Sequence, residues 1–230
     1  MIAAIRVLTW NLFHGRARPP AGRPLLAEFS RSLAEWEWDV ALLQEVPPWW
    51  PPLLARATGA AEHRTALTSR NACLPLRRAI ARHSPDLMKS NGGGSNALLA
   101  RVPLCGHREA QLTRRPERRV VHGAALSDGT WVVNLHASTH PERQNAADLV
   151  AAREHALSWA GGAPLIFGGD LNSRHPRIES LDLVASRWVD HIFVRGLEAV
   201  GPGAVLDRGT LSDHRPVVVL LKTLGPKEFP

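Results

Sequence analysis

The chain has 230 residues, of which 44% are hydrophobic and 21% charged, the balance of a globular protein with a buried core. No apolar run approaches the roughly 20 residues that a membrane-crossing helix needs, which argues against an integral membrane protein. The formal net charge is +7, and only Lys89, Lys222 and Lys227 of the 28 cationic residues are lysine. Because arginine binds phosphate with paired hydrogen bonds, this charge favours polyanionic partners such as nucleic acid.

The N-terminus and the cysteines both indicate the cytoplasm. The first residues, MIAAIRVLTWN, have neither a charged leader nor a long apolar stretch ending in small residues, so we expect no export signal. Cys73 and Cys105 lack the spacing of metal ligands and are expected to be reduced, half-buried side chains.

The first part of the chain predicts two strands and one helix. An opening strand is expected over 2–9, an amphipathic helix over 24–37 and a short buried strand over 39–44. The segment 47–52, PPWWPP, carries four prolines, which remove amide donors, and is expected to form neither a central strand nor a helix. The glycine-rich segment 82–96 is expected to be a flexible loop that contacts substrate.

The second part is dominated by strands. The expected elements are strands over 97–100, 120–126, 131–135, 164–167, 188–194 and 216–221, and a helix over 145–159. Ser127-Asp128-Gly129 predicts a hairpin turn between two of the strands. This order favours a two-layer β-sandwich flanked by helices over a doubly wound parallel sheet. Since there is no internal repeat or long linker, we expect one domain over 1–230.

Polar residues cluster where these strands end or begin. The segments are TWN (9–11), QE (44–45), GGDLN (168–172), DHIFV (190–194) and SDHRP (212–216). Side chains just beyond strand ends are well placed to build a site on a rigid sheet. Each segment alone is more often a turn or a cap than a catalytic group. Their joint occurrence in one chain argues against that structural interpretation.

The residue types suit hydrolysis of a phosphate ester. That reaction needs a nucleophile, neutralisation of charge on the phosphoryl oxygens and help for the leaving oxygen. A hard divalent ion prefers carboxylate and amide oxygens, so Glu45 is the best metal ligand, with Asn11 beside it. Asp170 is suited to orient and deprotonate water, and Asn172 to donate a hydrogen bond to developing charge. His214 is suited to supply a proton or a hydrogen bond.

Taken in order, the segments resemble the endonuclease/exonuclease/phosphatase family, which includes deoxyribonuclease I, exonuclease III, sphingomyelinases and inositol polyphosphate 5-phosphatases. The resemblance covers nearly the whole chain. It implies an α/β (α+β) fold, a four-layered α/β sandwich with two packed, mainly antiparallel β-sheets flanked by helices. It also implies Mg²⁺- or Mn²⁺-dependent attack of water on a phosphate ester.

The resemblance assigns further residues. Asp190 matches the carboxylate that orients His214, and Asp213 matches the acidic residue that approaches the metal or its waters. His136 resembles a central histidine that acts on the phosphate in some members.

Two positions are expected to bind substrate. Asn96 lies in a segment like the family's GNAxLS and either contacts phosphate or closes its loop. Arg119 matches a basic position of the family, which Arg118 fits almost as well.

The substrate is open on sequence alone. The arginines at 77, 78 and 82 and those at 114, 115, 118 and 119 favour a weakly sequence-selective nuclease that acts on DNA, with RNA as a second substrate. The stretch 173–189 is shorter than it often is in the family that the chain resembles, where it usually carries substrate-reading loops, and this argues against elaborate duplex recognition. The alternative is a phosphodiesterase or phosphatase for a small-molecule or lipid phosphoester, like sphingomyelinases or inositol phosphatases. Trp49 and Trp50 either stack on a base, enter a membrane interface or pack under a loop.

Three further expectations concern partners and activity. We find no amphipathic membrane hairpin, so no stable membrane association is expected. A monomer is expected. A catalytically inactive binding protein is disfavoured, because every central polar position of the family is filled.

Overall fold

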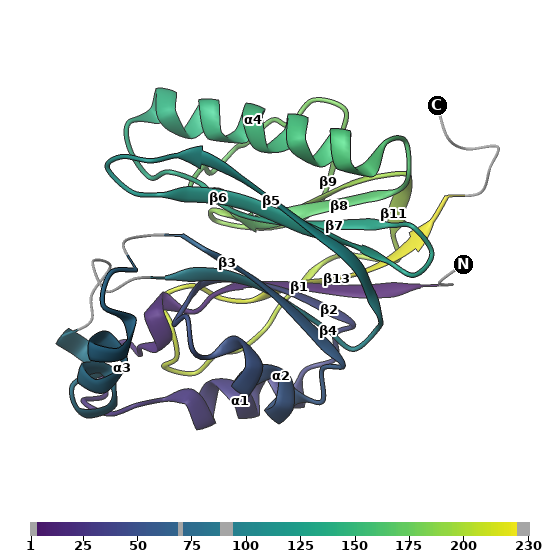
Figure 1. Ribbon diagram of the computed structural model, residues 1–230. Coiled ribbons are helices and arrows are strands. Elements are labelled where there is room, and N and C mark those ends of the chain that lie inside the picture. The colour runs from purple at the N-terminus through teal and green to yellow at the C-terminus, as the bar shows by residue number, and fades with distance from the viewer. Residues whose placement is uncertain (1–3, 69–70, 88–93, 225–230) are drawn as a thin grey trace.

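Two β-sheets stack face to face with helices on both outer faces (Figure 1). The computed structural model describes residues 4–68, 71–87 and 94–224. The α/β sandwich implied by the family resemblance is therefore confirmed.

The first sheet is formed mainly by the N-terminal half of the chain. Its strands are β1 (Ile5–Asn11), β2 (Val40–Val46), β3 (Glu62–Leu67), β4 (Ser95–Ala100), β11 (Leu197–Ala199), β12 (Ala204–Val205) and β13 (Val217–Thr223). They lie in the order β11-β13-β1-β2-β4-β3, with β12 beside β13. Only the β1–β2 pairing is parallel among those described.

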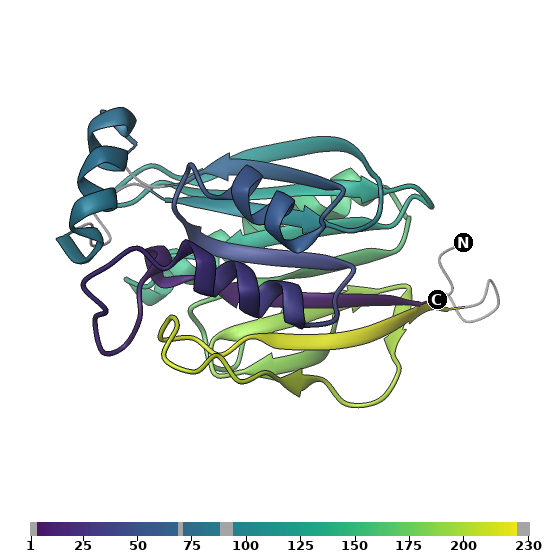
Figure 2. The same cartoon turned by 90° about the horizontal axis from the view of Figure 1, so that it is seen from below.

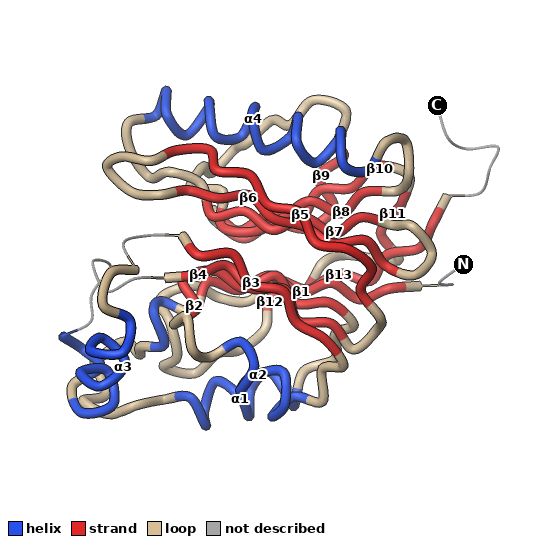
Figure 3. Tube along the Cα trace, in the orientation of Figure 1, coloured by secondary structure: helices blue, strands red, loops and turns tan. Residues whose placement is uncertain are grey.

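The second sheet follows in sequence. Its strands are β5 (Leu104–Thr113), β6 (Arg119–Leu126), β7 (Trp131–His136), β8 (Leu165–Asp170), β9 (Asp182–Arg187) and β10 (Asp190–Arg195). The order is β5-β6-β7-β8-β10-β9. The antiparallel β6–β7 pair confirms the predicted hairpin. The parallel β7–β8 pair requires a crossover, which α4 (Glu142–Ala160) supplies across the outer face of this sheet (Figure 3).

The remaining helices lie on the side of the first sheet. They are η1 (Phe13–Gly15), α1 (Leu26–Glu35), α2 (Pro51–Thr58), α3 (Leu74–His83) and η2 (Pro85–Leu87). Helices α1 and α2 cover the outer face of the first sheet, whereas α3 has no buried residue and lies at one end of the molecule (Figure 2). Among the described helices, none has the length and hydrophobicity that crossing a membrane requires.

Alternation along the strands places apolar residues in three layers. The central cluster, which includes Val7, Leu42, Val132, Ile166 and Ile192, lies between the two sheets. A second cluster lies between the first sheet and α1 and α2, and a third lies between the second sheet and α4. Strands buried on both faces show the near-continuous apolar runs from which they were predicted.

Toward one end of the sandwich the inner residues become polar. Four of them form what we call the buried polar layer: Thr9, Gln44, His122 and Asn134. Nε2 of Gln44 donates to Oδ1 of Asn134 across the sheets at 2.8 Å, and Nδ2 of Asn134 donates to the Leu43 carbonyl at 3.0 Å. Because buried polar groups need partners, these bonds fix how the two sheets meet.

The structure corrects three expectations. Pro51 and Pro52 lie in the first turn of α2, where backbone N–H groups have no hydrogen-bond partner within the helix, so proline is tolerated there. The expectation that 47–52 forms no helix was therefore wrong at these two residues. Both cysteines are free as expected, but they are exposed rather than half-buried. Within 82–96, α3 ends, η2 follows and β4 begins, so that segment is not simply a loop; residues 88–93 lie outside the described residues.

Candidate active site

The candidate site lies at the end of the sandwich where the inner faces turn polar. In the second sheet, His136 is paired with Asp170, and Asp170 with Asp190, so the three side chains stand side by side on β7, β8 and β10. In the first sheet, Asn11 ends β1 and is paired with Gln44 of the adjacent β2. Two sheets therefore contribute to one site.

Gly169 explains why β7 and β8 approach so closely beside Asp170. Its φ of 137° is rare for residues with a side chain, and a Cβ there would overlap the carbonyl oxygen of Leu135 on β7. The Gly-Gly-Asp segment thus continues β8 up to Asp170 instead of ending it at 167, as the sequence had suggested.

Glu45 reaches the site through an irregularity in β2. The register between β2 and β4 shifts between Leu43 and Val46, and Glu45 has a φ of 50°. A β-bulge of this kind re-aims a side chain relative to the regular alternation. A left-handed backbone at a residue other than glycine is held by its surroundings and is common at functional sites.

Asp170 is the most connected carboxylate of the site. Its Oδ2 accepts a hydrogen bond from Nδ2 of Asn11 at 2.8 Å, and its Oδ1 accepts one from the backbone N–H of Asn172 at 3.1 Å. Nε2 of His136 is 3.5 Å from Oδ2, and Nε2 of His214 is 3.8 Å from it. These contacts fix the orientation of a carboxylate that is 1% exposed.

His214 forms a hydrogen-bonded dyad with Asp190. The two side chains are joined through Nδ1 and Oδ2 at 2.8 Å. Burial alone would lower the pKa of His214, but the hydrogen bond and charge of Asp190 raise it to about 9. The loop between β12 and β13, which carries His214, is held to β1. Ser212 Oγ donates to the Asn11 carbonyl, and Trp10 Nε1 donates to the His214 carbonyl.

Glu45 faces two histidines. Its carboxylate oxygens lie 3.0 Å from Nε2 of His14 and 3.9 Å from Nε2 of His136. Burial, reinforced by the negative charges of Asp170 and Asp213, raises the pKa of Glu45 to about 7. Burial lowers the pKa of both histidines, so neither is positively charged at neutral pH to balance Glu45.

His14 is a site residue that the sequence analysis missed. It lies in η1, three residues after Asn11, with a φ of 55°. Its Nδ1 is buried and has no hydrogen-bond partner among the described residues. The available signal was a histidine directly after the TWN strand end, but spacing alone did not show that η1 turns it back toward Glu45.

Asn172 and Asp213 lie at the margin of the cluster. Nδ2 of Asn172 donates to the carbonyl of Ala137 at 2.9 Å, which leaves one amide N–H and the amide oxygen for other partners. One oxygen of Asp213 is 3.5 Å from the guanidinium of Arg18. The other is 3.9 Å from Nε2 of His214 and is buried without a hydrogen-bond partner among the described residues.

The two residues expected to bind substrate, Asn96 and Arg119, are both buried. Asn96 is fully buried within β4, and its Nδ2 donates to the Val120 carbonyl at 3.2 Å, which ties the sheets together. Arg119 is 4% exposed and pairs with Glu117 at 2.6 Å. Its charge acts on the site, since it contributes, after burial, to the lowered pKa of His136.

Helix α4 supports the site from behind, which the sequence analysis did not predict. Nδ2 of Asn145 donates to the carbonyls of Ser138 and Leu171, in the loops that follow β7 and β8. One side chain therefore holds together the loops that follow His136 and Asp170.

A model of the endonuclease/exonuclease/phosphatase family matches residues 8–214. The chain belongs to this family. Its members hydrolyse phosphoric esters and depend on divalent metal ions. The matched range includes every acidic and histidine residue of the site described above.

Solved structures of this family share the fold. An endonuclease/exonuclease/phosphatase from Beutenbergia cavernae aligns with a TM-score of 0.77 at 19% identity, over 97% of this chain and 72% of that one. TDP2 from Caenorhabditis elegans aligns with a TM-score of 0.67 at 15% identity, over 96% and 75%. A family protein from Bacteroides thetaiotaomicron aligns with a TM-score of 0.71 at 15% identity, over 96% and 98%. No curated protein matches the chain.

The residues fit a divalent metal ion of the kind that the family uses. Four carboxylates, those of Glu45, Asp170, Asp190 and Asp213, meet at the site, and hard divalent ions prefer such oxygens. The raised pKa of Glu45 and the unpartnered oxygen of Asp213 both indicate that a positive charge would stabilise the cluster.

The donor atoms of the site are not equally free. Ligand atoms of Asp170, Asp190 and His214 lie within 4.8 Å of one another, but Asp190 and His214 already share a hydrogen bond. Oδ1 of Asn11 accepts the Phe13 N–H at 2.8 Å, and Nδ2 of Asn11 donates to Asp170, so Asn11 primarily orients its neighbours.

Proposed function

We propose that this protein is a Mg²⁺- or Mn²⁺-dependent phosphodiesterase that hydrolyses DNA with weak sequence selectivity. The observation that carries the proposal is the convergence of Asp170, Asn11, His136 and the Asp190–His214 dyad on one point between two sheets, in a chain of net charge +7. Acidic, amide and imidazole groups in that arrangement suit hydrolysis of an anionic ester.

Asp170 is proposed to orient and deprotonate the attacking water. Its carboxylate is fixed by Asn11 and by the N–H of Asn172, so it presents a defined direction to a water molecule. The second amide N–H of Asn172 is proposed to donate to the phosphoryl oxygens as their charge develops.

His214 is proposed to act on the phosphate as an imidazolium. Asp190 keeps Nδ1 engaged, so Nε2 is the nitrogen that remains for the substrate. The raised pKa of His214 keeps the ring protonated at neutral pH, where it neutralises phosphoryl charge or gives up a proton. His136 stays neutral and is proposed to donate a hydrogen bond.

Glu45 and Asp213 are proposed to hold the metal ion, with Asn11 beside them. A bound divalent ion supplies Lewis-acid stabilisation of charge on the phosphoryl oxygens. His14, 3.0 Å from Glu45, is proposed to position that carboxylate.

DNA is favoured over a lipid substrate by where the tryptophans lie. Trp50 is 6% exposed and packs against Phe29, so it is not part of a protruding aromatic knob. Among the structural relatives is TDP2, and the net charge of +7 suits a polyanion. A small-molecule or lipid phosphoester remains the alternative substrate, and RNA a further one.

The test is metal-dependent nicking of supercoiled plasmid DNA by the purified protein, with EDTA and Asp170→Ala as controls. Nicking with Mg²⁺ or Mn²⁺ that both controls abolish is the expected result. Hydrolysis of bis-p-nitrophenyl phosphate or a phospholipid, without cleavage of DNA, would support a phosphodiesterase and overturn the proposal that DNA is its substrate.

A further inference from the structure

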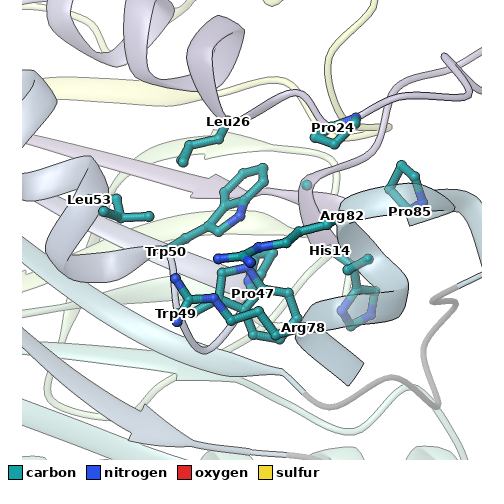
Figure 4. Close-up of a pocket in the computed structure, with 12 residues that line it drawn as sticks. His14, Pro24, Leu26, Pro47, Trp49, Trp50, Leu53, Arg78, Arg82 and Pro85 are labelled. Carbon is teal, nitrogen blue, oxygen red and sulfur yellow. The ribbon is translucent and has the colours of Figure 1, made fainter. Parts of the chain in front are cut away.

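Two cavities that share lining residues lie next to the candidate active site, and we call them together the cleft. The first, of about 280 Å³, lies between α3 and the α1–α2 side of the molecule (Figure 4). It is lined by His14, Gly15, Pro24, Leu26, Pro47, Trp49, Trp50, Leu53, Arg78, Ala81, Arg82 and Pro85. The second, of about 380 Å³, shares Trp49, Arg78 and Arg82 with the first. Sites for small organic groups are commonly about 300–1,000 Å³.

The walls of this cleft combine aromatic surface with two arginines. Trp49 is partly buried and lies in the wall of both cavities, whereas Trp50 forms a buried floor against Gly15. Arg78 and Arg82 are four residues apart on α3, so they share one face of the helix and reach toward the tryptophans (Figure 4).

None of the described residues neutralises the charge in the cleft. Both arginines are exposed, and no hydrogen bond or ion pair joins either of them to another described residue. Among the described residues that line the two cavities, none is acidic. Two guanidinium groups beside an aromatic wall suit a ligand that carries both a planar ring and an anionic group.

The cleft borders the reaction centre at His14. His14 lines the first cavity, and its Nε2 is 3.0 Å from the carboxylate of Glu45, the proposed metal ligand. A chain bound with one phosphate at the site would therefore reach the cleft with its neighbouring nucleotides.

We propose that this cleft binds an unpaired nucleotide of the substrate strand, with its base against Trp49 and its phosphate at Arg78 and Arg82. The inference rests on the proposed nuclease function and specifies its substrate as a single-stranded or frayed segment. A base within a duplex is stacked on both faces and paired at its edge, so it enters a concave cavity only after leaving the stack. Base–aromatic stacking also accepts every base, which agrees with weak sequence selectivity.

The test compares cleavage of one oligonucleotide sequence as a single strand and as a duplex, with Mn²⁺ or Mg²⁺. Wild-type protein is expected to cleave the single strand faster. Loss of stacking in Trp49→Ala, and loss of both cations in Arg78→Ala/Arg82→Ala, are each expected to lower kcat/KM for the single strand by about tenfold, mainly through KM. Trp49→Phe should recover part of the loss, since it restores an aromatic face.

The matched control is Arg143→Ala, which removes an exposed arginine from α4 on the opposite layer and should leave cleavage unchanged. Because Arg78 and Arg82 are exposed, their double variant should fold normally, which circular dichroism checks. Equal cleavage of single strand and duplex, or full activity of both cleft variants, would overturn this proposal alone. If the wild-type protein hydrolyses bis-p-nitrophenyl phosphate but cleaves no oligonucleotide, the nuclease function fails and this proposal fails with it.

Discussion

Asp170 is held by hydrogen bonds on both of its oxygens, so substitution there removes the proposed general base without opening the sandwich. We expect Asp170→Ala and His214→Ala each to lower turnover of bis-p-nitrophenyl phosphate by about 10²–10⁴-fold, the usual contribution of a general acid or base. Thermal unfolding followed by circular dichroism should show that both variants still fold. Full activity in purified Asp170→Ala would contradict the assignment.

The Asp190–His214 dyad predicts a specific pH dependence in metal-free protein. The pKa of His214 is raised from 6.5 to about 9 in the folded state, so its contribution to stability is complete below pH 6.5 and is lost as the pH rises through about 9. In Asp190→Asn, burial is no longer opposed by the carboxylate, and the pKa of His214 should fall below its usual range. NMR titration of the ring and urea unfolding across this pH range measure both effects. An unchanged titration midpoint in the variant would contradict this account of the dyad.

At the scale of single elements, the junction of β7 and β8 depends on Gly169. A methyl group there would overlap the Leu135 carbonyl, so Gly169→Ala is expected to destabilise the fold by about 3 kcal/mol or more and to displace Asp170. Gly162→Ala is the matched control, because Gly162 also has a positive φ, of 105°, but nothing lies within 4 Å of its added Cβ. Urea unfolding measures the stability of the two variants. A similar loss of stability in both would show that the cost comes from the positive φ and not from the close approach to Leu135.

Sequence patterns predicted the elements whose residues are uniformly buried. Strands β2, β4, β8 and β10 are buried almost throughout, and each has an apolar run from which it was predicted close to its observed bounds. Strands β3, β5 and β9 were missed because they lie at sheet edges, where most side chains of β5 and β9 are exposed and most of those of β3 are only half-buried. Helix α3 was missed for the same reason, since none of its residues is buried.

Site residues were likewise predicted where they adjoin buried strands. Segments that end buried strands, such as those with Asp170 and Glu45, were identifiable because polar residues interrupt apolar runs. The contacts that depend on local backbone turns were not identifiable. His14 meets Glu45 only because both have a positive φ, and Asn145 meets the site loops only because α4 crosses behind them.

At the scale of the whole molecule, the net charge of +7 predicts how the activity responds to salt. Binding of a phosphate backbone releases counterions, so kcat/KM for DNA should fall by at least about tenfold between about 50 and 200 mM salt. Hydrolysis of bis-p-nitrophenyl phosphate, which carries one phosphate, serves as the internal control and should change little. Equal salt dependence for both substrates would show that the positive surface does not recruit DNA.

The buried polar layer gives the interior of this protein two chemically different ends. At one end, Val7, Leu42 and Ile166 meet neighbours that require only similar volume, so related aliphatic residues can replace them. At the other end, Gln44 and Asn134 meet partners that require a donor or an acceptor at a fixed place. Tolerance to substitution should therefore change along each strand rather than from surface to centre. Random mutagenesis of equally buried positions should show that fewer substitutions are tolerated the closer a position lies to the reaction centre.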